Sequence, residues 1–225
     1  MKLEMNFWTL IGLGIALVGP SIIALYKKRS SLGFDSLIPK FLLWVLVILI
    51  SLILFNGENE NLQSIGFNKI TLRTFYIGII GGIGMMIIMA IVQMIFRKQK
   101  ASGGEYGYKD ITSLSFNRRV FSVITASIVE EFLFRGYAIE RLALITSNIW
   151  IAALISTLFF TIAHAFSWSI RHLIPVFLTG LFLASIYIME RDIIACIIAH
   201  FFLDSVAFLL MPYLIEKKNK SASGI

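Results

Sequence analysis

Residues 75–96 read FYIGIIGGIGMMIIMAIVQMIF, a run of 22 residues without a charged side chain. An α-helix rises about 1.5 Å per residue, so a run of this length crosses a hydrocarbon core of about 30 Å. A transmembrane strand would alternate between apolar and polar residues, and this run does not. The segment therefore predicts a transmembrane helix. Within it, Gly78 and Gly82 have the GxxxG spacing that suits a close helix contact, including dimerisation.

Six further apolar runs are long enough to cross the same core, which takes about 17–25 helical residues each. They lie at 6–26, 38–55, 120–138, 149–170, 173–189 and 193–213. Only helices and closed barrels satisfy their backbone hydrogen bonds in lipid, and none of the runs has the period of a barrel strand. We therefore predict an all-α fold, a polytopic integral membrane bundle of about seven transmembrane helices, with eight as the alternative.

The composition of the 225-residue chain agrees with a membrane protein. Hydrophobic residues make up 58% and charged residues 15%, against about 45–50% and about 25% in soluble domains. The net charge of +7 would suit a nucleic-acid-binding protein if the Lys and Arg formed a stripe on one folded face. Here they lie between apolar runs, so we expect the lipid bilayer, and no nucleic acid, as a partner. The single cysteine, Cys196, excludes an internal disulfide.

Ionisable residues inside the spans mark the candidate site, because each costs about 2.5–3.5 kcal/mol at the bilayer centre. They gather in the last four predicted spans, as Glu130, Glu131, Arg135, His164, His200 and Asp204. Glu131 and Arg135 are four residues apart with the acid first, so we expect them to pair on one helix face. Glu130 points about 100° away and lacks that partner. His200 and Asp204 are also four residues apart, which lets the carboxylate orient the imidazole or share a ligand with it.

The charge of this group needs compensation. If Arg135 neutralises Glu131, two carboxylates remain beside two neutral imidazoles, and a buried site does not keep two uncompensated charges. Either a divalent cation binds, the histidines become protonated, or a carboxylate takes up a proton. Zn²⁺ or another divalent metal with a bound water suits this donor set, with Glu130, His164 and His200 as candidate ligands. The same groups could activate water without metal, through a glutamate base.

Three segments stand in a fixed order, each in an apolar run: Glu130-Glu131-Phe-Leu-Phe-Arg135, Phe160-Thr-Ile-Ala-His164 and His200-Phe-Phe-Leu-Asp204. They resemble the EExxxR, FxxxH and HxxxN/D motifs of the CAAX prenyl protease and bacteriocin-processing (CPBP, or Abi) family of intramembrane metalloproteases. The resemblance covers roughly residues 118–212. Each motif alone is weakly specific, whereas three in register are fairly specific.

The resemblance implies an endopeptidase that hydrolyses a peptide bond within or beside the membrane, in a cavity open to the cytoplasm. Its substrate would be a peptide or a membrane-associated protein, prenylated in the case of true CAAX processing. By the same resemblance, Glu130 and His164 would hold and activate the water, and Glu131 and Arg135 would support them. His200 and the residue four positions later would stabilise the oxyanion.

That later residue is Asp204, where the eukaryotic prenyl-protein proteases have Asn. An ionised carboxylate cannot donate a hydrogen bond to an oxyanion. Asp204 is therefore protonated, or it orients His200, or it helps to bind a cation, and the sequence leaves these three roles open.

Two other classes of function fit the same residues. A bacteriocin self-immunity or partner-binding membrane protein would use the polar cluster to shape a binding cavity and would cut nothing. A cation or proton transporter also uses buried carboxylates and histidines, although the interrupted paired repeats of many carriers are not apparent. The sequence leaves the substrate and the oligomeric state open.

The polar stretch 97–119 contains Ala101-Ser102-Gly103-Gly104, which is typical of a flexible linker. We therefore expect an N-terminal three-helix membrane part over 1–110 and a C-terminal four-helix catalytic core over 111–225, within one membrane domain. Fourteen Lys and Arg fall in loops on one side and five on the other. Because basic loops stay in the cytoplasm, we expect the N-terminus outside and the C-terminus inside, in a bacterial plasma membrane.

Overall fold

The computed structural model describes residues 5–30, 32–33, 35–96, 111, 113–168, 170–214 and 217, and all regular secondary structure in this part is helical. The elements are α1 (Phe7–Arg29), α2 (Ile38–Leu52) with its π-helical end η1 (Ile53–Gly57), the 3₁₀ turn η2 (Leu62–Ile65), α3 (Leu72–Phe96), α5 (Phe116–Glu130), the π-helix η3 (Glu131–Ala138), α6 (Ile139–Thr146), α7 (Ile149–Ala165), α8 (Ile170–Glu190), α9 (Ile193–Ser205) and the π-helix η4 (Val206–Leu210). The all-α prediction is confirmed.

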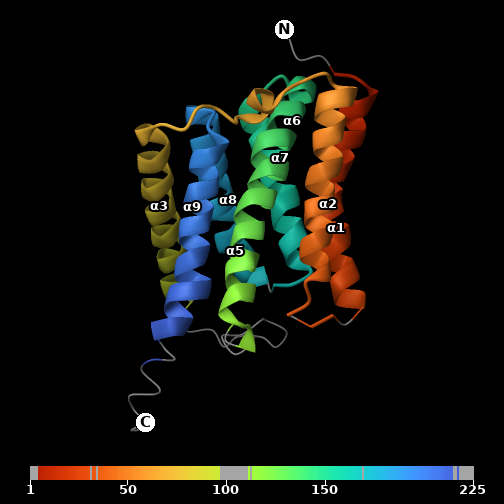
Figure 1. Cartoon of the computed structure of the whole chain (residues 1–225). Coiled ribbons are helices and arrows are strands. Elements are labelled where there is room, and N and C mark those ends of the chain that lie inside the picture. The colour runs from red at the N-terminus through yellow and green to blue at the C-terminus, as the bar shows by residue number, and fades with distance from the viewer. Residues whose placement is uncertain are drawn as a thin grey trace.

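The helices lie side by side as a bundle, with α3 at one edge and α1 and α2 at the opposite edge (Figure 1). Each of the seven predicted spans coincides with a helix, and α5, η3 and α6 follow one another without a break. In the described part of the chain, five helices are long and apolar enough to cross a membrane, and α7 is a shorter apolar helix. The α5–η3–α6 segment falls outside those five because its middle carries the ionisable residues. These helices make the chain an integral membrane protein.

Two tight turns determine which of the C-terminal helices pack as antiparallel neighbours. Ser147 and Arg191 both have a φ of 52°, the left-handed conformation that ends a helix. The next residue caps the following helix in each case: Asn148 accepts from two backbone N–H groups of α7, and Asp192 does the same for α9. Each turn therefore reverses the chain within two residues, so that α6 pairs with α7 and α8 with α9.

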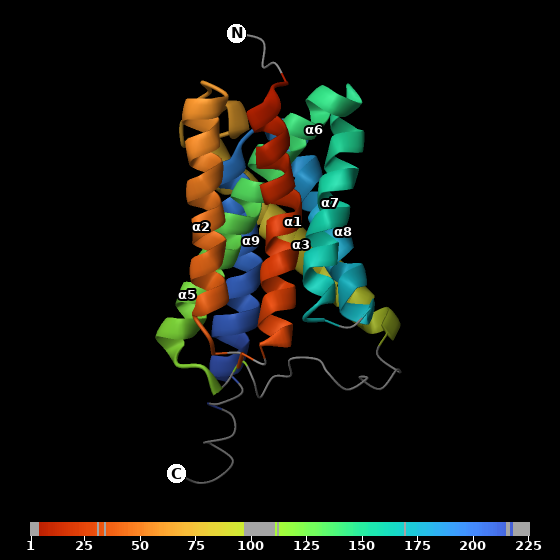
Figure 2. The same ribbon diagram turned by 90° about the vertical axis from the view of Figure 1, so that its right-hand side faces the viewer.

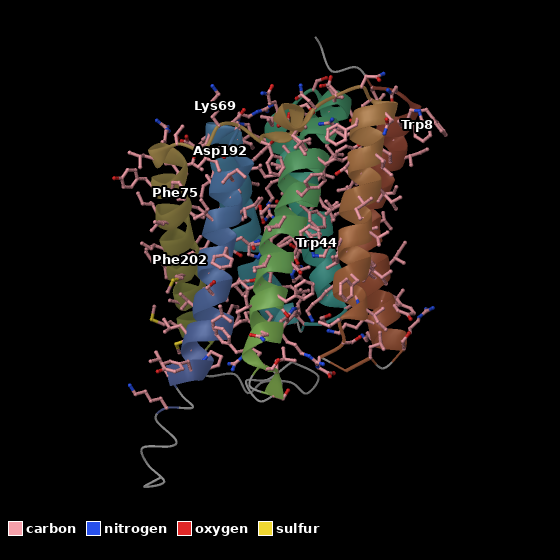
Figure 3. All side chains as sticks on the ribbon, in the orientation of Figure 1. Trp8, Trp44, Lys69, Phe75, Asp192 and Phe202 are labelled. Atoms are coloured by element: carbon pink, nitrogen blue, oxygen red, sulfur yellow. The ribbon has the colours of Figure 1, made fainter. Side chains whose placement is uncertain are left out.

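The α1–α2 pair packs against the C-terminal helices, where α1 contacts α7 and α2 contacts α5. Figure 2 shows α1 and α2 in front of this part of the bundle. Trp44 of α2 lies beside α5 (Figure 3), and its indole N–H donates to Thr125 Oγ1 at 3.2 Å.

The predicted linker at 101–104 lies outside the described residues, and the division into two parts stays a prediction. The start of α1 and the end of α9 lie at opposite ends of the bundle (Figure 1), and which end faces the cytoplasm also stays a prediction.

The glycines of α3 serve a contact within the chain. A Cβ on Gly78 would lie 2.6 Å from Ile198 Cγ2, and one on Gly82 would lie 2.8 Å from a ring carbon of Phe202. Both neighbours belong to α9, which runs beside α3 in Figures 1 and 3. The GxxxG spacing therefore provides the close approach of α3 and α9, as small residues do between membrane helices.

We expect Gly78→Ala to destabilise the protein by about 1–3 kcal/mol, because the added methyl group overpacks the α3–α9 contact. Gly14→Ala is the matched control: it lies in helix α1, and no atom lies within 4 Å of its added Cβ. That substitution should leave stability unchanged or raise it by up to about 1 kcal/mol, through helix propensity alone. Thermal unfolding of both variants in one detergent measures the difference, and equal midpoints would contradict the contact.

Candidate active site

The site is built on η3, the π-helix that continues α5 without a break, and all eight of its residues are buried. π-helical turns are rare and occur frequently at functional sites. The Phe134 carbonyl accepts a hydrogen bond of 2.6 Å from Ser156 Oγ on α7. This bond ties the segment that carries the first motif to the helix that carries the second.

Glu131 joins the first and third motifs. Its Oε1 accepts a hydrogen bond of 2.9 Å from Arg135 Nη1 and lies 2.8 Å from His200 Nδ1. The Glu131 side chain is fully buried, so these two bonds hold its charge in a medium of low dielectric. The expected Glu131–Arg135 pair is present, and the structure adds that the carboxylate orienting His200 is Glu131.

Arg135 is itself fixed from two sides. Its Nη2 donates to the Gly180 carbonyl of α8 at 3.3 Å, and its guanidinium lies 4.4 Å from the centre of the Phe160 ring. Phe160 is the first residue of the second motif. The arginine therefore contacts α8 and α7 while it neutralises Glu131.

Glu130 and Asp204 lie on the other side of the His200 ring. His200 Nε2 is 3.9 Å from Glu130 Oε2 and 3.6 Å from Asp204 Oδ2. Both separations are longer than a hydrogen bond, and both allow a water molecule bound to the two groups. The Glu130 and Asp204 side chains are 17% and 20% exposed, whereas Glu131 is 0% exposed. Glu130 and Asp204 are therefore the partly exposed carboxylates of this site.

His164 lies on α7 with its Nδ1 2.9 Å from the Phe160 carbonyl oxygen. A carbonyl only accepts hydrogen bonds, so Nδ1 carries a proton and Nε2 of the neutral ring is the free acceptor. In the described part of the chain, no direct hydrogen bond joins His164 to the ionisable residues of the other two motifs.

An apolar cavity of about 400 Å³ lies between the start of α5 and the C-terminal end of α9 with η4. Phe116 and Arg119 at the start of α5 line one side of it, and Phe202 and Ser205 of α9 line the other. Ser205 directly follows Asp204 in the chain. An apolar side chain could fill this cavity, but Glu130, His164, His200 and Asp204 do not line it.

Residues 113–206 match the family model of the type II CAAX prenyl endopeptidases, described as Rce1-like. The match contains all three motifs, and the first and third of them meet at His200. This part of the chain is similar to the CAAX protease family. No curated protein matches the chain, and neither does any solved structure. The matched segment leaves α1, α2 and α3 outside its limits.

The candidate site contains carboxylate oxygens and imidazole nitrogens, which are the donor types that suit zinc. In the described residues, however, no three His, Cys, Asp or Glu side chains are arranged so that they could hold a metal ion. His164 Nδ1 is bound to a backbone carbonyl and His200 Nδ1 to Glu131, so each ring has only Nε2 left. The zinc site at Glu130, His164 and His200 stays a prediction.

A second buried polar cluster, which the sequence did not predict, lies further along the helix that carries the first motif. Arg141 donates to Glu58 Oε2 from Nη2 at 2.6 Å, and Tyr137 Oη donates to Glu58 Oε1 at 2.8 Å. The Arg141 and Glu58 side chains are 0% and 2% exposed. The apolar run ends at 138 and so predicts a loop at Arg141, whereas the helix continues to Thr146. Glu58 lies 83 residues away, so no local spacing pointed to the pair.

Proposed function

We propose that this protein is an intramembrane endopeptidase that hydrolyses a peptide bond of a membrane-associated or peptide substrate with water activated by Glu130. The observation that carries the proposal is the meeting of the partly exposed Glu130 and Asp204 side chains at His200 Nε2. The family match of residues 113–206 supports the peptidase class.

In the proposed reaction, Glu130 takes a proton from a water molecule as the water oxygen forms a bond to the substrate carbonyl carbon. Glu130 then returns this proton to the amide nitrogen as the carbon–nitrogen bond breaks. A carboxylate base serves this task when it is within reach of the water. The 3.9 Å gap between Glu130 Oε2 and His200 Nε2 leaves room for a water bound to both groups.

His200 is proposed to stabilise the oxyanion that forms on the substrate. A protonated imidazole donates from both nitrogens, so that Nδ1–H is held by Glu131 and Nε2–H is directed to the oxyanion. Asp204, at 3.6 Å from the same Nε2, balances the charge of the ring on this side. Because Glu131 occupies Nδ1, we assign Asp204 to this charge balance and Glu131 to the orientation of His200. His164 is proposed to bind the water or the substrate carbonyl through Nε2.

The peptidase proposal is tested with the purified protein in lipid nanodiscs and two fluorogenic peptides that differ only in a prenyl group. We expect wild-type protein to cleave at least one of them, and His200→Ala and His164→Ala to remove cleavage while the helical circular dichroism stays unchanged. Cleavage at the wild-type rate by either variant would remove that histidine from the mechanism. If no variant and no wild-type preparation cuts either peptide, the partner-binding and transport alternatives take precedence.

Metal analysis of the same preparation tests whether the protein binds a metal ion and needs it for cleavage. Activity that survives chelation to far less than one metal ion per chain would assign the metal-free route through Glu130. Stoichiometric zinc that is lost in His164→Ala, together with chelator-sensitive cleavage, would instead assign a metalloprotease. In that case Glu130, His164 and His200 would hold the metal, which would supply a bound water of lowered pKa.

A further inference from the structure

The cluster around Glu58 lies at the C-terminal end of the π-helix. Glu58 directly follows η1, and its carboxylate receives hydrogen bonds from Tyr137 in η3 and from Arg141 in α6. Arg141 also donates to the Ser64 carbonyl at 3.3 Å, and its guanidinium lies 4.6 Å from the centre of the Tyr137 ring. These contacts connect the segment after α2 to the helix that carries the first motif.

Tyr137 is also fixed by close packing. Its side chain is 0% exposed, and its hydroxyl and ring press against Gly12 of α1 so closely that a Cβ at Gly12 would overlap the hydroxyl. The side chain therefore has one position available, in which the hydroxyl meets Glu58. This contact fixes the rotation of η3 about its own axis and its position along α1.

A π-helix needs such contacts because its wide turns are rare and short-lived outside a supporting structure. In η3 the first turn is held by Glu131 with Arg135, the middle by the bond from Ser156 to the Phe134 carbonyl, and the end by Tyr137. If the last turn relaxes to α-helical hydrogen bonding, one residue moves out of the turn and the preceding side chains rotate by about 100°. Glu130 and Glu131 would then leave their positions around His200.

We infer that Glu58, acting through Tyr137 and Arg141, is a positioning residue that holds η3 in its π-helical form and so keeps Glu130 and Glu131 facing His200. The inference rests on the proposed peptidase function. It assigns a role to the N-terminal part of the chain, because Glu58 lies outside the family match at 113–206. The matched segment alone would lack the carboxylate that anchors its own catalytic helix.

The test compares Tyr137→Phe with a matched control, Tyr187→Phe. The Tyr187 hydroxyl donates to Glu140 Oε1 at 2.7 Å, and Glu140 also accepts from Arg191 Nη2 at 2.7 Å. Both tyrosines are 0% exposed, so each substitution removes one buried hydroxyl from a glutamate that is paired with an arginine. Only the Tyr137 hydroxyl belongs to η3.

Amide hydrogen exchange of residues 130–138 in nanodiscs is the first measurement, and it needs no substrate. We expect Tyr137→Phe to raise the exchange rate of these amides about tenfold, as the loss of one hydrogen bond to a charged group predicts, and Tyr187→Phe to leave it unchanged. The second measurement is peptide cleavage. We expect Tyr137→Phe to lower kcat about tenfold with KM unchanged, which corresponds to about 1.4 kcal/mol, while Tyr187→Phe cleaves like wild type.

Equal exchange at 130–138 in the two variants, or equal kcat, would overturn the inference. Glu58→Gln provides a second variant, and it should show a larger loss of protection at 130–138 than Tyr137→Phe, because it weakens the bonds to both Tyr137 and Arg141. A smaller loss of protection in Glu58→Gln than in Tyr137→Phe would also contradict the inference. If wild-type protein cuts none of the peptides, the proposed function fails, while the exchange comparison still decides whether Glu58 positions the helix.

Discussion

Glu130→Gln is expected to lower kcat for peptide cleavage by about 10²–10⁴-fold, the contribution of a positioned general base. The amide has nearly the same shape as the carboxylate but cannot take a proton from water. Glu130 is 17% exposed and makes no hydrogen bond among the described residues, so the substitution removes chemistry without removing a structural bond. Cleavage of the fluorogenic peptide by purified variant in nanodiscs measures the effect.

Glu190→Gln is the control for this experiment. Glu190 pairs with Arg73 at 2.8 Å at the rim of the bundle, where Arg73 is 73% exposed, and such pairs contribute about 0–1 kcal/mol to stability. We expect this variant to cleave like wild type. A Glu130→Gln protein that also keeps the wild-type kcat would exclude Glu130 as the base and would leave Asp204 as the other partly exposed carboxylate of the site.

Arg135→Met is expected to destabilise the fold by about 3–5 kcal/mol, the cost of breaking a buried ion pair from one side. Glu131 Oε2 is buried without a hydrogen-bond partner among the described residues, so Arg135 and His200 are the groups that compensate this carboxylate. Methionine fills much of the space of the arginine stem while it removes the charge. Thermal or denaturant unfolding in one detergent, followed by tryptophan fluorescence, gives the change in unfolding free energy.

The double variant Glu131→Gln, Arg135→Met distinguishes lost charge compensation from lost packing. Removing the stranded carboxylate should make the double variant about 0.5–3 kcal/mol more stable than the sum of the two single changes predicts. Additive effects would mean that packing against Phe160 and Gly180, and not the ion pair, accounts for the loss. Cleavage should fall in the double variant, because the amide that replaces the Glu131 carboxylate orients His200 through a weaker, uncharged hydrogen bond.

The parts of the site that sequence predicted are those that depend on one helix. Glu131 and Arg135 pair because residues four apart share a helix face, and the π-helical turns keep them at 2.9 Å. His200 and Asp204 are likewise on one helix, and their 3.6 Å separation follows from the same spacing. The sequence did not predict which carboxylate binds His200 Nδ1, because Glu131 lies 69 residues away.

The glycines of α3 show the same difference between what spacing along one helix predicts and what packing between helices decides. Gly78 and Gly82 predicted a close helix contact from their spacing alone, yet spacing does not name the partner helix. The structure assigns the contact to α9 of the same chain, through Ile198 and Phe202. A partner helix is chosen by the packing of the whole bundle, and its residues lie more than a hundred positions away in the chain.

By itself, the sequence determined that this is a bundle of membrane helices, because an uninterrupted apolar run of about 20 residues can satisfy its backbone in lipid only as a helix. It also determined which ionisable residues lie inside the spans. The tertiary structure alone decided that Glu131 orients His200, that Glu58 and Arg141 form a buried pair, and that residues 131–138 are π-helical. The physical reason is that apolar length and helical spacing are local properties, whereas the partner of a buried charge is fixed only when distant helices pack together.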